Sequence, residues 1–269
     1  MKKAWSLPAI AALVLVGGYY AWTVWRPPLA ERPAAPANVP VPPAPLPAPP
    51  AAPQERYPIA TSAVPAQAEA PLPALDESDA AFGAAVAQLL GAKALPAYLY
   101  PDRMIRRLVA TVDNLPRQAA PARMLPWKPV PGAFRVERSA AGTAIDPLNA
   151  ARYGLCVEAL RGLDAKAAVD LYVRYYPLFQ RAYNELGYPK GHFNDRLVEA
   201  LDDLLAAPDP APPVALVQPR VLYQFADPEL EARSAGQKMM MRMGAQNAAQ
   251  ARTVLREIRS ELMRRVSRR

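Results

Sequence analysis

The last two thirds of the chain repeat their apolar residues at the spacing of amphipathic helices. Apolar side chains three and four residues apart form a single stripe on a helix, and that stripe is buried against neighbouring elements. The pattern predicts helices over residues 79–91, 100–116, 146–163, 165–176, 177–186, 195–205, 227–244 and 245–269. A chain of this kind is expected to form a mainly α domain.

Residues 177–196 are the stretch with the most distinctive residues, and their pattern predicts a helical hairpin. Pro177 is expected to kink the helix before it or to begin a new helix, because proline removes a backbone hydrogen bond. Gly187 is placed as a left-handed helix end. Asn194 is predicted to cap the following helix. The aromatic residues of this stretch then fall on the apolar faces, where their role is structural.

Short extended segments interrupt the helices. Residues 133–138 predict one short strand in a stretch rich in loops. Residues 212–225 predict two further extended pieces, and Pro219 favours an edge position because proline cannot donate a ladder hydrogen bond. The β element is therefore expected to be minor.

The amino terminus reads as a membrane anchor. No charged residue occurs from Ala4 to Trp25, a run long enough to cross a hydrocarbon core of about 30 Å as a helix. The run ends in bulky aromatic residues rather than a small-residue cleavage site, which favours a retained anchor over a cleaved signal. Lys2 and Lys3 are expected to stay in the cytoplasm, leaving the rest of the chain in the periplasm.

A proline-rich stretch follows the anchor. About half of the 33 prolines lie between Arg26 and Pro73. Such a composition favours polyproline II and predicts a disordered, semi-rigid linker. The predicted organisation is an anchor over 1–25, a linker over 26–73 and a helical domain over 74–269.

The net charge of +8 suggests acidic partners. Seven arginines lie between Arg252 and Arg269, which in a cytoplasmic protein would suggest nucleic acid. In the periplasm we expect no nucleic acid, and anionic lipid or an acidic envelope polymer fits better. The alternative is a solvated helix end whose cations complement the helix dipole.

His192 is the only histidine, which excludes sites that need two. With Glu185 or Asp195 it could form an acid–base pair, so an envelope hydrolase near this hairpin is the alternative function. The more common role of a histidine before a helix is structural. We expect no catalytic residue, cofactor or metal, and the protein is more simply explained as a non-enzyme.

Other reactive residues also have structural explanations. The pairs Asp202–Asp203 and Glu229–Glu231 could suggest glycoside hydrolysis, but they fall on helices, where solvated faces explain them. Methionines at 239–241 and 243 could bind copper(I), and core packing explains them better. Cys156 is expected to be a small buried residue on one face with Leu155, Ala159 and Leu160.

Arg242 stands within the methionine run, and if buried it would require a carboxylate partner. We name five residues whose positions would discriminate a partner-binding site from a scaffold. They are Arg152, Tyr183, Asp195, Asp227 and Arg242. Clustering in an open cleft would favour a site, and burial in mutual pairs would favour scaffolding.

Four stretches together carry a family resemblance. They are "LPALDESDAAF", "RRLVATVDNLPR", "LYVRYYPLFQRAYNELGYPKGHFNDRLVEALDDLLAAP" and "FADPELEARSAGQKMMMRMG". In order and spacing, over about residues 72–262, they resemble the bacterial family catalogued as domain of unknown function 3014. The resemblance implies a membrane-anchored Gram-negative protein with a proline-rich linker, and it implies no activity, cofactor or catalytic residue.

These observations lead to one expectation. The chain is a single-pass protein of the bacterial inner membrane whose periplasmic helical domain binds an envelope protein or acidic polymer. The ligand, the oligomeric state and the physiological process are not encoded in any motif of the sequence.

Overall fold

A computed structural model describes residues 54–59, 71–90 and 99–266, all within the compact unit Ala51–Arg269. The predicted membrane helix over 4–25 and the proline-rich residues 26–53 lie outside the described residues. Among the helices that are described, none combines the length and the apolar character that crossing a bilayer requires.

The described part of the chain is mainly helical, as predicted. Two short 3₁₀ helices, Leu75–Glu77 and Ala122–Met124, accompany the α-helices. The α-helices are α2 (Asp79–Leu90), α4 (Met104–Asn114), α5 (Asn149–Arg152), α6 (Gly154–Arg161), α7 (Ala165–Glu185), α8 (Phe193–Leu205), α9 (Pro228–Glu231), α10 (Ala235–Arg242) and α11 (Ala245–Arg265).

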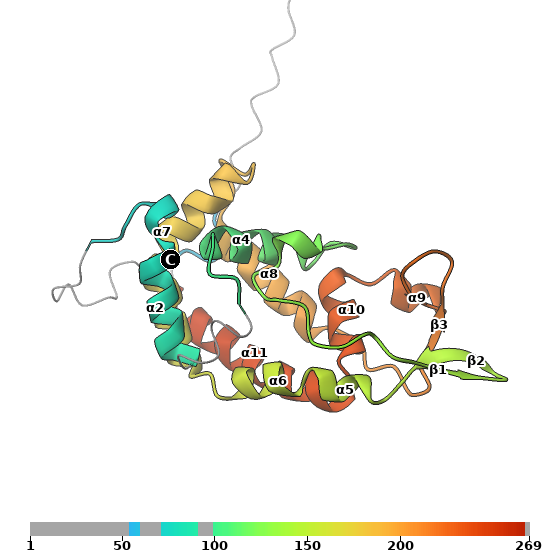
Figure 1. Cartoon of the computed structure of the whole chain (residues 1–269). Coiled ribbons are helices and arrows are strands. Elements are labelled where there is room, and N and C mark those ends of the chain that lie inside the picture. Colours follow the sequence, from blue (N-terminus) through green and yellow to red (C-terminus); the bar gives the residue numbers. More distant parts are fainter. Residues whose placement is uncertain (1–53, 60–70, 91–98, 267–269) are drawn as a thin grey trace, which may run out of the picture. The chain divides into compact units, whose positions relative to one another are not determined.

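The three longest helices are packed together and organise the domain. Helix α11 contacts α6, α7 and α8, and α4 contacts α7 and α8 (Figure 1). Helix α10 packs on α8, and α2 packs on α4 and α7. Helix α8 therefore contacts four other helices, and the hairpin that joins it to α7 is central to the fold.

Side-chain caps begin several of these helices at the residues that the sequence indicates. The Asp164 carboxylate accepts the N–H groups of Lys166 and Ala167 at 2.8 and 3.1 Å, so α7 begins where its cap predicts. Asp227 caps α9 in the same way by accepting from Glu229 N at 2.8 Å. A cap residue satisfies N–H groups that have no partner within the helix.

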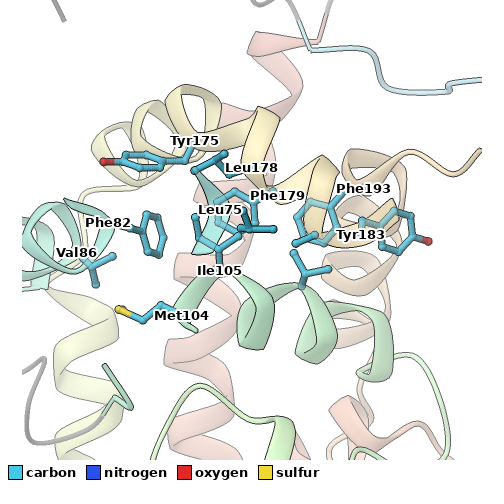
Figure 2. Close-up of a cluster of buried hydrophobic side chains, with 12 residues drawn as sticks. Leu75, Phe82, Val86, Met104, Ile105, Tyr175, Leu178, Phe179, Tyr183 and Phe193 are labelled. Atoms are coloured by element: carbon cyan, nitrogen blue, oxygen red, sulfur yellow. The ribbon is translucent and has the colours of Figure 1, made fainter. Parts of the chain in front are cut away.

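The largest buried cluster joins α2, α4, α7 and the start of α8 (Figure 2). Phe193 is 1 % exposed and stacks on Phe179, with ring centroids 5.5 Å apart and planes 11° apart. Phe82 meets Phe179 edge to face at 5.7 Å. The aromatic residues of the hairpin are therefore core residues, as the sequence pattern predicts.

Methionines fill a second region of the core. Met240, Met241 and Met243 are 2, 6 and 9 % exposed. Met240 and Met243 pack with α8 and α11, and Met241 packs beneath the sheet. The expectation that this run packs in the core is confirmed.

A small antiparallel sheet forms from four strands in the order β1-β2-β3-β4. The strands are β1 (Val136–Ser139), β2 (Gly142–Ile145), β3 (Ala215–Val217) and β4 (Gln224–Phe225). The sheet is larger than the sequence indicates, because residues 136–145 form a hairpin rather than one strand. Strand β3 pairs on both sides, so only β4 of the two later pieces is an edge strand.

Four local predictions are corrected. The predicted helix over 227–244 divides into α9 and α10, because Ser234 caps a new helix. Helix α7 runs as one helix through Pro177, so no new helix begins there. Asn194 lies inside α8 and His192 takes the cap position, because the Asn194 side chain is used in a tertiary hydrogen bond described below. The predicted helix over 146–163 divides at Tyr153 into α5 and α6.

Candidate functional site

The turn between α7 and α8 is closed by aromatic stacking. Tyr183 is 7 % exposed, and its ring stacks on Tyr188 at 4.6 Å. Gly187 has a φ of +121°, which suits glycine and ends α7. A Cβ at Gly191 would lie 2.9 Å from Tyr183 Cε1, so only glycine lets the chain approach the ring this closely. This geometry is that of a tight, packed turn.

Glu185, a candidate acid or base, is held by two arginines. Its carboxylate accepts from Arg106 of α4 and from Arg181, the latter at 3.0 Å. These hydrogen bonds, first from Arg106 and then from Arg181, lower the pKa of the Glu185 carboxyl. Arg106 also bonds Asp76 at 2.8 Å. A general acid at neutral pH needs a raised pKa, so this surface ion-pair network does not suit Glu185 for that role.

His192 and Asp195 face a different part of the chain. His192 Nδ1 lies 3.8 Å from Glu55 Oε1. Asp195 accepts the backbone N–H groups of Arg56 and Tyr57 at 2.8 to 3.2 Å. The partners of Glu185 lie on α4 and α7, whereas those of His192 and Asp195 lie in residues 54–59. The three predicted candidates therefore do not share one set of contacts.

The sequence pattern did not predict that Asp113, a buried carboxylate on α4, is surrounded by two arginines and a tyrosine. Asp113 is 5 % exposed, and its carboxylate accepts hydrogen bonds from Arg117 at 2.9 Å, from Arg196 at 3.2 Å and from the Tyr188 hydroxyl at 3.3 Å. Two guanidinium groups compensate one buried charge, as burial of a charge requires. Arg196 also pairs with Glu199 at 2.8 Å. The cluster ties α4 to α8 and to the hairpin turn.

Asp203 forms a second polar contact of this kind. Its carboxylate accepts from the Ser234 hydroxyl at 2.6 Å and from Gln237 Nε2 at 3.0 Å. Burial raises the pKa of the Asp203 carboxyl, and the two hydrogen bonds partly offset that effect. Asp202 on the same helix instead pairs with Arg259. The adjacent carboxylates thus point to different partners, and Asp203 is not the solvated residue that the sequence indicates.

The five discriminating residues do not form one cluster. Asp227 is a helix cap, and Tyr183 and Asp195 lie at the hairpin. Arg152 donates to the carbonyl groups of Pro131 and Gly132. Arg242 donates to the Tyr223 carbonyl at 3.1 Å and lies 5.1 Å above the Phe225 ring.

A carbonyl oxygen and an aromatic ring thus stabilise the Arg242 guanidinium in place of the expected carboxylate. Because Arg242 is only half-buried, these contacts are enough to offset the cost of shielding its charge. Arg152 and Arg242 both lie close enough to Tyr153 to lower the pKa of its phenol, although burial has the larger, raising effect. These two are the only members of the set for which the described contacts show a shared neighbour.

Cys156 is half-buried on α6, and burial raises the pKa of its thiol. A thiol with a raised pKa is a weak nucleophile. The expected common buried face is wrong, because Leu155 is 60 % exposed, Cys156 is only half-buried, and Val157 is the buried residue of this helix. Leu155 borders a shallow depression together with Glu158, Arg161 and Asn247.

The most exposed apolar residues lie in the turn between β3 and β4. Val221 is 85 % exposed and Leu222 is 77 % exposed, while Val217 at the end of β3 is 45 % exposed. The sequence pattern does not predict this exposed surface, because the alternation of β-branched residues there predicts strands but not which side chains stay in solvent. Across the described ranges, no three acidic, histidine or cysteine side chains gather as a metal site would require.

Among the comparisons with known proteins, only the comparison with family models gives a match. The family model described as "Protein of unknown function (DUF3014)" matches residues 104–259, which run from the first residue of α4 well into α11. No curated protein and no solved structure matches the chain. The matched range contains the α7–α8 hairpin, the Asp113 cluster and the sheet.

Proposed function

The chain belongs to the DUF3014 family, whose description assigns no activity, and we propose that it is a membrane-anchored envelope protein that displays a non-enzymatic binding domain. The uncharged run from Ala4 to Trp25 supports the anchor, and Lys2 and Lys3 support a periplasmic position of the domain. The domain then acts as a scaffold that holds a partner at a distance from the inner membrane.

The exposed β3–β4 turn is the observation that carries this proposal. Val221 and Leu222 keep 85 and 77 % of their surface in solvent although the domain buries apolar residues elsewhere. Adjacent large apolar side chains that stay exposed favour a contact surface for another protein. Arg220, also exposed, adds a cation at the same turn and favours a partner with acidic residues around an apolar patch.

The arginine-rich end of the chain supports a partner protein over an acidic polymer. Arg252 forms a two-point pair with Asp209 at 2.8 and 2.9 Å. Arg259 pairs with Asp202, and Arg265 pairs with Asp170. These side chains hold α11 to neighbouring segments, so much of the positive charge there is already neutralised within the domain.

Two measurements test the proposal. Protease added to intact spheroplasts should remove the domain, and protection of the domain until lysis would contradict the periplasmic topology. A photo-reactive residue in place of Leu222 should give a saturable cross-linked adduct with one envelope protein. A neighbouring Val221→Asp substitution should abolish the adduct, because a charge at an apolar contact is costly to bury.

Ala140→Asp is the matched control, since it adds the same charge to the exposed turn between β1 and β2 of the same sheet. It should leave the adduct unchanged. Equal loss with both variants would show that charge on the sheet, rather than the β3–β4 turn, determines the contact. An adduct that persists with Val221→Asp would contradict binding at this turn.

A further inference from the structure

Residues Gln54–Ile59 lie against the start of α8 although they fall in the range predicted as linker. Inside this segment Gln54 and Arg56 are exposed, Glu55, Tyr57 and Pro58 are half-buried, and Ile59 is 9 % exposed. Four of the six side chains are therefore at least partly shielded from solvent, and the shielding is greatest at Ile59. A segment that only spaced the domain from the membrane would have no reason to show this pattern.

The segment is held through its backbone by two adjacent side chains of α8. Asp195 Oδ1 accepts the N–H of Tyr57 at 2.8 Å, and Asp195 Oδ2 accepts the N–H of Arg56 at 3.0 Å. Asn194 Nδ2 donates to the Tyr57 carbonyl at 2.7 Å. The N–H and the C=O of one residue are thus both bound, and the bonds to the carboxylate are charge-assisted.

Both groups belong to the domain, and Asn194 is oriented by a contact within it. Asn194 is 0 % exposed, and its Oδ1 accepts from the Tyr172 hydroxyl of α7 at 3.1 Å, which orients the amide. Asp195 has a side chain only 13 % exposed. With the segment in place both groups are shielded from water, and the amide that Tyr172 orients resembles a preorganised polar group of a ligand site.

Side-chain contacts add selectivity. Ile59 enters an apolar cluster with Val198 and Leu262, and it forms an antiparallel bridge with Val266 just after α11. Tyr57 packs against the same cluster. Every group named here that holds the segment belongs to residues 172–266, and we call the surface that these groups form the groove.

We propose that this groove, between α7, the start of α8 and the end of α11, is a binding site for a short peptide, and that Glu55–Ile59 occupies it as an intramolecular ligand. The recognised pattern is an acidic residue, an aromatic residue and a β-branched residue at alternate positions, as in Glu-Arg-Tyr-Pro-Ile. A partner segment with this pattern would bind by displacing the chain's own segment.

The groove involves none of the β3–β4 turn, so peptide binding and the partner contact proposed above can fail separately. A ligand that belongs to the same chain competes with free peptide at a fixed effective concentration. The site is therefore self-occupied until a peptide of higher affinity is present.

The test uses the full chain in detergent and a fluorescent peptide of sequence Gln-Glu-Arg-Tyr-Pro-Ile. In a chain carrying Tyr57→Ala and Ile59→Ala, fluorescence anisotropy should show saturable binding. The unchanged chain should bind the peptide at least tenfold more weakly, because its own segment competes. Absence of binding to the double variant, or equal binding to both chains, would overturn the proposal.

Adding Asp195→Asn to the double variant should weaken peptide binding at least tenfold, since the charge-assisted bonds to two N–H groups are lost. Glu199→Gln on the same helix is the matched control and should leave peptide binding unchanged, because Glu199 is exposed and pairs with Arg196 rather than with the segment. Equal peptide affinity with and without Asp195→Asn would show that the peptide binds elsewhere and would overturn the assignment.

A second measurement does not depend on the folding of the double variant. Hydrogen exchange at the amides of Arg56 and Tyr57 should be slow in the unchanged chain and at least tenfold faster in Asp195→Asn. Exchange that is equally fast in both chains would mean that the carboxylate does not hold the segment.

Discussion

Replacing Phe193 by alanine should destabilise the domain more than any exposed change in the same hairpin. Phe193 is 1 % exposed, stacks on Phe179 at 5.5 Å and lies 5.7 Å from the ring of Tyr183. Truncation of a buried phenylalanine typically costs about 3–5 kcal/mol, of which each aromatic pair contributes about 0.5–1.5 kcal/mol beyond its buried area. With three aromatic neighbours, Phe179, Tyr183 and, at 6.2 Å, Tyr172, we expect about 4 kcal/mol.

Such a loss is large compared with the about 5–15 kcal/mol by which native domains are stable. Urea unfolding of the full chain in detergent, followed by far-ultraviolet circular dichroism, should show a lower midpoint with the same dependence on urea concentration. For a domain of this size, about 4 kcal/mol corresponds to a Tm lower by about 8–16 °C.

Leu186→Ala provides the matched control, because Leu186 lies in the same hairpin, at the end of α7, but is 39 % exposed. It should cost less than about 1 kcal/mol. If Phe193→Ala and Leu186→Ala cost the same within about 1 kcal/mol, the aromatic residues of the hairpin would not form the core, and the structural reading of this stretch would be refuted.

Two further predictions concern the turn and the pH dependence. Gly191→Ala should destabilise the domain by about 1–3 kcal/mol, because its Cβ would lie 2.9 Å from Tyr183 Cε1. Gly154→Ala, with no heavy atom within 4 Å of its Cβ at the start of α6, should leave Tm unchanged or raise it, and equal effects would contradict the packing of the turn. The hydrogen bond from Arg135, and after it the one from the Leu148 N–H, lower the pKa of the Asp146 carboxyl below its ordinary value of 3.8. As the pH falls, Asp146 is therefore protonated in the unfolded chain before it is protonated in the folded domain. The stability that ionised Asp146 contributes is lost as the pH falls below 3.8. Asp146→Asn should therefore reduce the difference between Tm at about pH 6 and at about pH 3, and an unchanged difference would show that Asp146 does not contribute to acid sensitivity.

Much of the helical content follows from local signals. The carboxylates of Asp164 and Asp227 accept N–H groups one turn into α7 and α9, and Gly187 takes the positive φ that ends α7. These features depend on residues within one helical turn of each other, so the sequence pattern is sufficient to predict them. The mainly α character and the core role of the hairpin aromatics follow in the same way.

Local sequence signals predict the wrong role for a residue whose side chain binds a partner far away in the sequence. Asn194 has the residue type of a helix cap, yet its amide binds the Tyr57 carbonyl, which lies 137 positions earlier. Asp113 stands in the sequence like any polar residue of a helix, and its burial depends on Arg196 of α8 and Tyr188 of the hairpin turn, which pack against it. No spacing rule links such residues, since the contacts arise from packing.

By itself, the sequence determined the uncharged amino-terminal run, the proline-rich stretch, the helical nature of the domain and the apolar faces of its helices. Each of these depends on composition or on spacing within a few residues. The tertiary structure alone decided which carboxylates are paired, that β3 is a central strand, and that residues 54–59 lie on α8 rather than in the linker. The physical reason is that these outcomes are set by which surfaces meet when the helices pack, and a contact between residues more than a hundred positions apart leaves no periodic trace in the chain.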